Sequence, residues 1–274
     1  MSLAGKTLFI TGSSRGIGLA IGLRAARDGA NVVVVAKTVE PHPKLPGTIH
    51  TAAAAIEAAG GKALAVQCDV RSEDEIKHAV AAAVERFGGI DIVVNNASAI
   101  RLGGTAQVDA KAFDLMTSIG PRATYLVTRA ALPYLEKGTN PHVLTLSPPI
   151  ALASKWVGTA PAYTFKKYGM TLLTLGFAAE FRARGIAANT LWPKTVIATA
   201  AVQNLLGGDA VIKASRTPAI VADAAYLVLD SDARACTGNT FIDEDVLRTH
   251  GISDFDGYAV APGTPLGEDI FLDA

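Results

Sequence analysis

The sequence lacks the features that mark disulfide-stabilised, secreted and membrane-spanning proteins. It has only two cysteines, Cys68 and Cys236, which give no disulfide framework and lie in apolar stretches as small core residues do. Its unbroken apolar runs, such as Val32 to Ala36, are strand-sized and far shorter than the ~20 residues of a membrane span. The N-terminus enters a strand pattern without the apolar stretch of a signal peptide. We therefore expect a cytoplasmic protein without a membrane span.

An excess of charge of either sign is also missing. Lys plus Arg and Asp plus Glu each number 25, so the formal net charge is zero. No basic run and no basic patch interleaved with aromatics is present, which argues against a nucleic-acid partner. Half of the 274 residues are hydrophobic, which allows a large core in a chain of single-domain length. We expect one domain over residues 1–274, with no metal site.

Strand and helix patterns alternate along the chain, and Val32 to Val35 form the continuous β-branched run of a parallel strand buried on both faces. The expected strands are Thr7 to Thr11, Asn31 to Ala36, Ala63 to Gln67, Ile90 to Val94, His142 to Leu146, Ile186 to Leu191 and Asn239 to Ile242. The expected helices cover residues 16–28, 48–59, 72–87, 109–118, 121–136, 161–184, 197–206 and 218–230, and the tail from Arg248 has little periodicity. This order predicts an α/β fold, a doubly wound parallel sheet of about seven strands with helices on both faces, which binds ligands at its carboxyl edge.

A glycine-rich stretch, Thr11-Gly12-Ser13-Ser14-Arg15-Gly16-Ile17-Gly18, joins the first strand to the first helix. Glycines at such a turn let the backbone approach a pyrophosphate, and the helix N-terminus presents N–H groups to the anion. The stretch therefore predicts a dinucleotide site; an ordinary tight connection is the alternative. The cofactor-binding candidates from this segment are Gly12, Ser14, Arg15, Gly16, Ile17 and Gly18.

The end of the second strand favours NADP(H) over NAD(H). An NAD site usually places an acid about 20 residues beyond the glycines, where it binds the ribose 2′-hydroxyl. The residue 19 positions after Gly18 is Lys37, and Arg15 adds a second cation. Two cations without an acid suit a 2′-phosphate, unless both side chains are simply solvated. His42 and Lys44 are further candidates for this phosphate.

Tyr163 and Lys167 are four residues apart in an expected helix, so they share one face. A cation beside a phenol favours the phenolate and lowers the pKa of tyrosine from its usual value near ~10. Such a tyrosine can exchange a proton with a substrate oxygen near neutral pH. The spacing alone also occurs in exposed helical pairs, but beside a glycine-rich turn and a parallel sheet it predicts a catalytic pair.

Together these motifs resemble the short-chain dehydrogenase/reductase family over nearly the whole chain. The matching pieces are Thr11-Gly12-x-x-x-Gly16-x-Gly18, Cys68-Asp69-Val70, Asn95-Asn96-Ala97-Ser98 and Tyr163-x-x-x-Lys167. The resemblance implies that Asp69, with Val70, lies at the adenine and that Asn95 and Ala97 line the cofactor pocket. It implies that Tyr163 is the acid/base and that Lys167 binds the nicotinamide ribose. Outside this context Asp69 would be a helix-entry residue and Asn95 part of a turn.

A closer resemblance links the chain to the hydroxysteroid dehydrogenase-like type 2 group. It rests on Lys37-Thr38, Pro41-His42-Pro43-Lys44, Asn95-Asn96-Ala97-Ser98-Ala99-Ile100, Ser147-Pro148-Pro149 and Trp192-Pro193-Lys194-Thr195. Members of that group often carry a C-terminal sterol-carrier domain, which we do not expect in a chain that stops at Ala274. The resemblance implies a lipid-like carbonyl substrate and a homodimer or homotetramer.

Two members of the family's usual Asn-Ser-Tyr-Lys tetrad depart from the pattern. Ser147, 16 residues before Tyr163, is the nearest match to the serine, although strand alignment puts Pro148 in the usual place. We predict that Ser147 orients the substrate carbonyl, with Ser154 as the other candidate and a structural role for Ser147 as the alternative.

The tetrad asparagine is replaced by Gly120, which has no side chain to hold a proton-relay water. Either Ser118 or a backbone carbonyl takes its place, or turnover is impaired. Pro121 fits the first position of a helix and predicts a helix break there.

The loop after the sixth strand completes the expected site. The family's Pro-Gly is Pro193-Lys194 here, and Pro193, Thr195 and Thr199 are candidates for the nicotinamide end, although either threonine suits a helix cap equally. Residues 196–215 have the composition of a lid. Ile100, Leu102, Trp156 and Trp192 are candidates for an apolar substrate wall, or for core positions.

The sequence thus predicts reversible hydride transfer between NADP(H) and an apolar carbonyl or alcohol. The alternative is a nucleotide-binding or scaffolding protein that has kept the fold and lost efficient catalysis.

Overall fold

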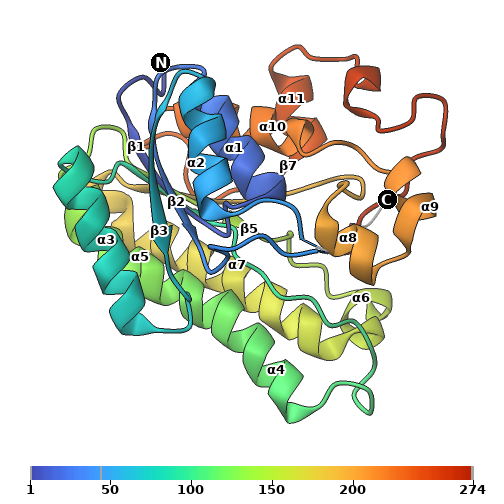
Figure 1. Ribbon diagram of the computed structural model, residues 1–274. Helices are drawn as coiled ribbons and strands as arrows, with labels where there is room; N and C mark the ends of the chain where they lie inside the picture. Colours follow the sequence, from blue (N-terminus) through green and yellow to red (C-terminus); the bar gives the residue numbers. More distant parts are fainter. Residues whose placement is uncertain (1, 44, 273–274) are drawn as a thin grey trace.

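The computed structural model describes residues 2–43 and 45–272, and in these residues seven strands form one parallel sheet (Figure 1). The strand order is β3-β2-β1-β4-β5-β6-β7. The strands are β1 Thr7–Thr11, β2 Asn31–Ala36, β3 Lys62–Gln67, β4 Ile92–Asn95, β5 His142–Leu146, β6 Ala187–Trp192 and β7 Thr240–Ile242. The order reverses between β1 and β4, which is the switch point where parallel sheets bind ligands. The predicted doubly wound fold is confirmed.

Helices cover both faces of the sheet (Figure 1). One core cluster joins the sheet to α1 Gly16–Ala26, α2 Ile49–Ala58, α10 Ala219–Asp230 and α11 Asp243–Thr249. The other joins it to α3 Glu73–Phe87, α5 Ala123–Leu135 and α7 Pro161–Phe181. The remaining helices are α4 Ala110–Thr117, α6 Ser154–Thr159, α8 Ala200–Leu205 and α9 Gly208–Lys213, with 3-10 turns at Arg182–Arg184 and Asp256–Tyr258.

The valines of β2 show why the sheet is buried on both sides. Val32 and Val34 belong to one core cluster and Val33 and Val35 to the other, since successive side chains point to opposite faces. All four are fully buried, and each contributes about 1.5–3 kcal/mol of apolar burial. Cys68 and Cys236 are both in the reduced, unpaired form and pack in these two clusters as expected.

The helix break predicted at Pro121 takes the form of a kink. Residues Ser118–Arg122 form one π-helical turn that joins α4 to α5, and Gly120 inside it has non-helical angles, φ −81° and ψ −105°. This kink lies against α7, because a Cβ built on Gly169 would be 3.2 Å from Pro121 Cβ.

The strands agree with the prediction to within two residues at each end, whereas three short helices, α6, α9 and α11, were not predicted. Helix α7 begins at Pro161, and the 3-10 turn after it ends at Gly185, which has φ +70°. Across residues 2–43 and 45–272, no helix combines the length and apolarity needed to cross a bilayer.

Candidate active site

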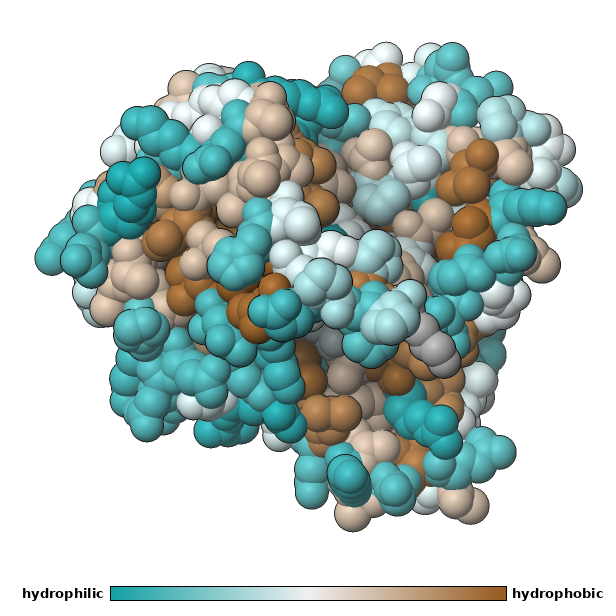
Figure 2. Space-filling model, viewed as in Figure 1, coloured by the Kyte–Doolittle hydropathy of each residue, from teal (hydrophilic) through white to brown (hydrophobic). Residues whose placement is uncertain are grey.

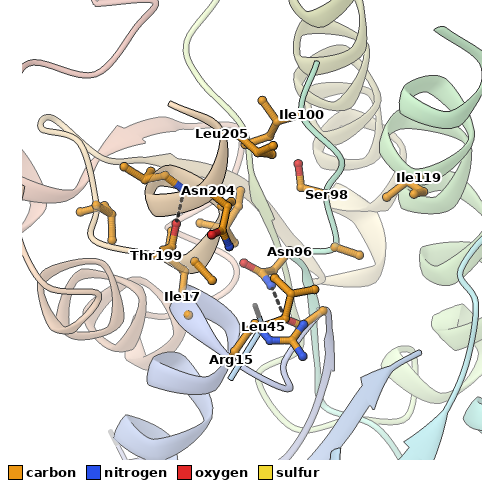
Figure 3. Close-up of a pocket in the computed structure, with 18 of the residues that line it drawn as sticks. Arg15, Ile17, Leu45, Asn96, Ser98, Ile100, Ile119, Thr199, Asn204 and Leu205 are labelled. Atoms are coloured by element: carbon orange, nitrogen blue, oxygen red, sulfur yellow. Dashed lines mark hydrogen bonds between the residues drawn. The ribbon is translucent and has the colours of Figure 1, made fainter. Parts of the chain in front are cut away.

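A cavity of about 770 Å³ lies at the carboxyl edge of the sheet. Figure 3 shows its wall running from Arg15 and Ile17 at one end to Ser98 and Ile100 at the other. In Figure 2, apolar side chains surround the hollow between the α8–α9 region and α4. Most of the predicted site residues line this cavity: Gly12, Ser14, Arg15, Gly16, Ile17, Lys37, Asp69, Val70, Ala97, Tyr163, Lys167 and Pro193.

The turn between β1 and α1 fits a pyrophosphate. Gly12 has φ +68°, and a Cβ there would lie 2.9 Å from Ala97 Cα, so glycine allows the two strand ends to meet. Arg15 at the N-cap of α1 makes no side-chain capping bond, and the first turn holds no acid. The first N–H groups of α1, next to the cavity-lining Gly16 and Ile17, therefore have no side-chain capping partner and suit an anion.

Asn95, predicted to line the cofactor pocket, does not line this cavity, whereas the next residue, Asn96, does. Asn95 ends β4 with its side chain toward α5, where Nδ2 donates to Thr128 Oγ1 at 3.2 Å. The next side chain points to the opposite face: Asn96 lines the cavity and donates to the carbonyls of Thr11 and Gly12 at 2.9 and 3.0 Å. Gly18 also does not line the cavity; it makes room for Asn96, whose Nδ2 would be 2.5 Å from a Cβ at that position.

The predicted cations, Arg15 and Lys37, both line the cavity, and Lys37 is paired with an acid. Arg15 Nε and Nη2 donate to the carbonyls of Pro46 and Gly47 at 2.8 and 2.7 Å. Lys37 Nζ lies 3.1 Å from Asp69 Oδ2, and Arg71 holds the same carboxylate with two nitrogens. The hydrogen bonds from Arg71, and then Lys37, hold the pKa of Asp69 well below its usual range. His42 also lines the cavity, while Lys44 lies outside the described residues.

Tyr163 and Lys167 lie on the cavity-facing side of α7. Lys167 Nζ donates to the carbonyl of Leu146 at the end of β5 at 2.7 Å and lies 4.6 Å from the ring centroid of Trp192. Each of the pair is 4% exposed. The structure therefore brings together the predicted acid/base and the predicted ribose-binding lysine, beside the glycine-rich turn.

The protonation behaviour of the pair differs from the expectation. Burial raises the pKa of Tyr163 above its ordinary value, with the charge of Asp269 adding to the effect. Burial lowers the pKa of Lys167 to about 7, while Asp269 opposes this shift. A lysine that is only partly charged at neutral pH cannot offset the desolvation of the phenol. In this structure the phenol is therefore held protonated instead of being activated toward phenolate.

The C-terminal tail packs over Tyr163, a contact that the sequence alone did not predict. Phe271 stacks on Tyr163 with ring centroids 6.1 Å apart, and contacts the rings of Trp156, Tyr168 and Trp192. Trp192 Nε1 donates to the carbonyl of Ile270 at 2.9 Å. The signal available in the sequence was the apolar Ile270-Phe271-Leu272 in an otherwise polar tail.

Asp269 places a buried carboxylate in the cavity wall. Replacing this carboxylate with an amide is expected to stabilise the protein, by an amount that depends on pH. Burial raises the pKa of Asp269 to about 7. The folded state then binds more protons than the unfolded state between pH ~4 and ~7, so stability falls as pH rises through that window. After Asp269→Asn, the unfolding free energy at pH 8 should increase by about 1–3 kcal/mol, less the lost attraction to Lys167.

Urea denaturation at pH 4.5 and pH 8 checks this result, with Asp209→Asn on the exposed start of α9 as the matched control. The Asp269→Asn gain should be larger at pH 8 than at pH 4.5. A gain that is independent of pH would contradict the burial of a charged carboxylate at this position.

Neither predicted serine reaches the cavity. Ser147 is fully buried, and its Oγ accepts a hydrogen bond from Thr171 Oγ1 at 3.0 Å, beneath the segment that follows β5. Ser154 opens the exposed helix α6. Ser147 and Ser154 are both absent from the described residues that line the cavity. This geometry favours a structural role for Ser147 over a role in orienting the substrate.

The loop after β6 places its two threonines differently. Thr199 lines the cavity and caps α8 by accepting from Val202 N at 3.4 Å, so the capping alternative holds for it. Thr195 is buried outside the cavity lining, and its Oγ1 has no hydrogen-bond partner among the described residues.

Helices α8 and α9 lie in residues 196–215, the segment expected to form a lid. The apolar part of the wall is formed by Ile100, Leu102, Ile119, Trp192, Val196, Ile197, Val202, Leu205, Leu206 and Ile270, while Trp156 packs on Phe271 instead.

Known proteins resemble this chain in sequence and fold. A family model described as short chain dehydrogenase matches residues 6–208. Hydroxysteroid dehydrogenase-like protein 2 of Danio rerio is 58% identical over 271 residues, 99% of this chain but less than two thirds (65%) of that relative. A short chain dehydrogenase from Mycobacterium thermoresistibile is 56% identical with a TM-score of 0.94, covering 100% of this chain and 97% of that one. A metagenomic short-chain oxidoreductase in complex with NADP is 25% identical with a TM-score of 0.72, covering 88% and 98%.

Proposed function

The chain belongs to the short-chain dehydrogenase family, and from this premise we propose that it interconverts an apolar carbonyl and its alcohol with NADP(H). The observation that carries the proposal is the position of Tyr163 and Lys167 on the same cavity as the glycine-rich turn. A nicotinamide cofactor in this cavity would supply the hydride for reduction or accept it in oxidation. The protein itself must then bind the substrate and move one proton.

Tyr163 is the proton donor in this proposal. The phenol is protonated at neutral pH, so it has a proton to deliver to the oxygen of a carbonyl as that oxygen gains negative charge. Lys167, whose Nζ donates to the carbonyl of Leu146, is the residue that would hold the cofactor ribose in this proposal. The apolar wall that includes Ile100, Leu102 and Leu205 supports a lipid-like, acyl or steroid-like substrate, because such a surface binds little else well.

The cofactor preference is the first expected result. Arg15 is oriented by the carbonyls of residues 46 and 47 and keeps further N–H groups for a 2′-phosphate. Arg15→Ala should weaken NADPH binding by about 10–100-fold, as expected for a lost charged hydrogen bond, and leave NADH affinity nearly unchanged. Fluorescence titration of both cofactors measures this. Arg27→Ala, an exposed arginine at the end of α1, is the matched control. Tighter binding of NADH than NADPH by the parent protein would contradict the proposal.

Two observations favour the alternative, a nucleotide-binding protein without efficient turnover. Ser147 points away from the cavity, and Gly120 supplies no side chain. The absorbance of NADPH, followed with medium-chain ketones, acyl thioesters, steroids and quinones, separates the two functions. Turnover of an apolar carbonyl supports the oxidoreductase, whereas cofactor binding with no turnover on the panel supports the alternative.

We also propose that residues 1–274 act as one domain in a homodimer or homotetramer. An apolar surface on α4 and α7 supports this: Phe113 and Phe165 stack with centroids 5.7 Å apart, and Phe165 and Leu172 are 58% and 60% exposed. Sedimentation velocity of the parent protein and of a Phe165→Glu variant measures the oligomeric state of each and so tests this proposal.

A further inference from the structure

The kink at Gly120 is occupied by a side chain from another helix. A Cβ built on Gly120 would lie 2.6 Å from Cγ and 2.9 Å from Cε of Lys166, closer than real Cβ atoms approach. The aliphatic part of Lys166 thus fills the space that a side chain at position 120 would need. Glycine at this position and lysine at position 166 are sterically coupled, since the first leaves room for the second.

Lys166 is a fully buried lysine with polar contacts on the cavity side. Its Nζ donates to Ser98 Oγ at 2.5 Å and to the carbonyl of Ala99 at 3.2 Å, and lies 5.1 Å from the ring centroid of Tyr163. Residue 163 and residue 166 are one helical turn apart, so the amine is placed beside the catalytic face of α7. Burying an amine is costly, and these two bonds offset part of the cost.

Ser98 links this amine to the cavity, because it both accepts the hydrogen bond from Lys166 and lines the cavity wall. It follows β4, is exposed and lines the cavity wall, where Figure 3 shows it between Asn96 and Ile119. A serine hydroxyl has one proton and two lone pairs. Because Ser98 Oγ accepts from Lys166, its own proton is directed to another acceptor, and the amine increases its strength as a donor.

On the premise of the proposed function, we propose that Ser98, held and polarised by Lys166, is the hydroxyl that hydrogen-bonds the substrate carbonyl. This pair takes the role of the serine that Pro148 replaces, and Gly120 leaves room for its lysine. Lys166 is the positioning residue, and Ser98 is the residue that touches substrate. The bond to Ser98 strengthens as the carbonyl oxygen becomes negative, so it acts mainly on the transition state.

The test compares Lys166→Met, which keeps the aliphatic chain against Gly120, with Ser98→Ala. Each should lower kcat by about 10–100-fold, as for the loss of one transition-state donor, and change NADPH affinity less than about twofold. If Lys166 acts through Ser98, the double variant should be no slower than either single variant. Lys111→Met, an exposed lysine on α4, is the matched control and should keep the parent kcat.

A reciprocal exchange tests the steric coupling separately. Gly120→Asn alone should lower the unfolding midpoint, because its side chain meets Lys166, and Gly120→Asn with Lys166→Ala should recover it. Parent-like kcat in Lys166→Met or Ser98→Ala, while Tyr163→Phe is inactive, would overturn the inference and leave the proposed function intact. Parent-like turnover in Tyr163→Phe would instead overturn the proposed function.

Discussion

The Tyr163→Phe variant is expected to lose about 10²–10⁴-fold in kcat/KM, the range of general acid catalysis. The substitution removes one oxygen from a side chain that is 4% exposed and keeps the ring that stacks on Phe271. The fold and the cofactor cavity should therefore persist, and NADPH affinity should change little. Steady-state kinetics on any substrate that the parent protein reduces, with fluorescence titration of NADPH, measures both quantities.

Tyr168→Phe is the matched control for this experiment. Its hydroxyl donates to the carbonyl of Ala151 at 2.6 Å and accepts from Ala151 N at 3.2 Å, outside the cavity. This variant should lose about 1–2 kcal/mol of stability, as for a lost buried hydrogen bond, and keep kcat/KM within a few-fold of the parent. Undiminished turnover in Tyr163→Phe would remove the phenol from the mechanism.

The fold was predictable because its signals are local and repeated. Val32 to Val35 form a strand that is apolar on both faces, and the glycines from Gly12 to Gly18 mark a turn typical of a dinucleotide-binding connection. Tyr163 and Lys167 could be placed on one face because helical periodicity alone fixes their relation. In each case the information lies within a few consecutive residues.

The remaining site residues depend on contacts between distant segments. The difference between Asn95 and Asn96 follows from where β4 ends, and a shift of one residue reverses the side chain. Ser147 turns toward Thr171 because of the local path after β5, and Lys166 reaches Ser98 across the kink at Gly120. No spacing in the sequence encodes these contacts.

The second prediction concerns Phe271 in the tail. Its replacement tests whether burial sets the pKa values of Tyr163 and Lys167 while the fold is kept. The Phe271→Ala variant should lose about 3–5 kcal/mol of unfolding free energy, because a side chain that is 2% exposed is removed from among four aromatic rings. Water should then reach Tyr163 and Lys167. Because burial is the largest cause of both shifts, the pKa of Lys167 should rise from about 7 toward its ordinary value and that of Tyr163 should fall.

Urea denaturation measures the loss of stability, and NMR titration of isotope-labelled lysine side chains, assigned through Lys167→Met, measures the pKa of Lys167. Phe255→Ala is the matched control: Phe255 is also buried, but it packs beside Arg216, Arg248 and Tyr258, away from the cavity lining. It should lower stability and leave the pKa of Lys167 near 7. An unshifted lysine in a folded Phe271→Ala protein would mean that the tail is not what keeps water from the catalytic pair. A shifted one would mean that the side chain of Phe271 lowers the pKa of Lys167 by excluding water from it.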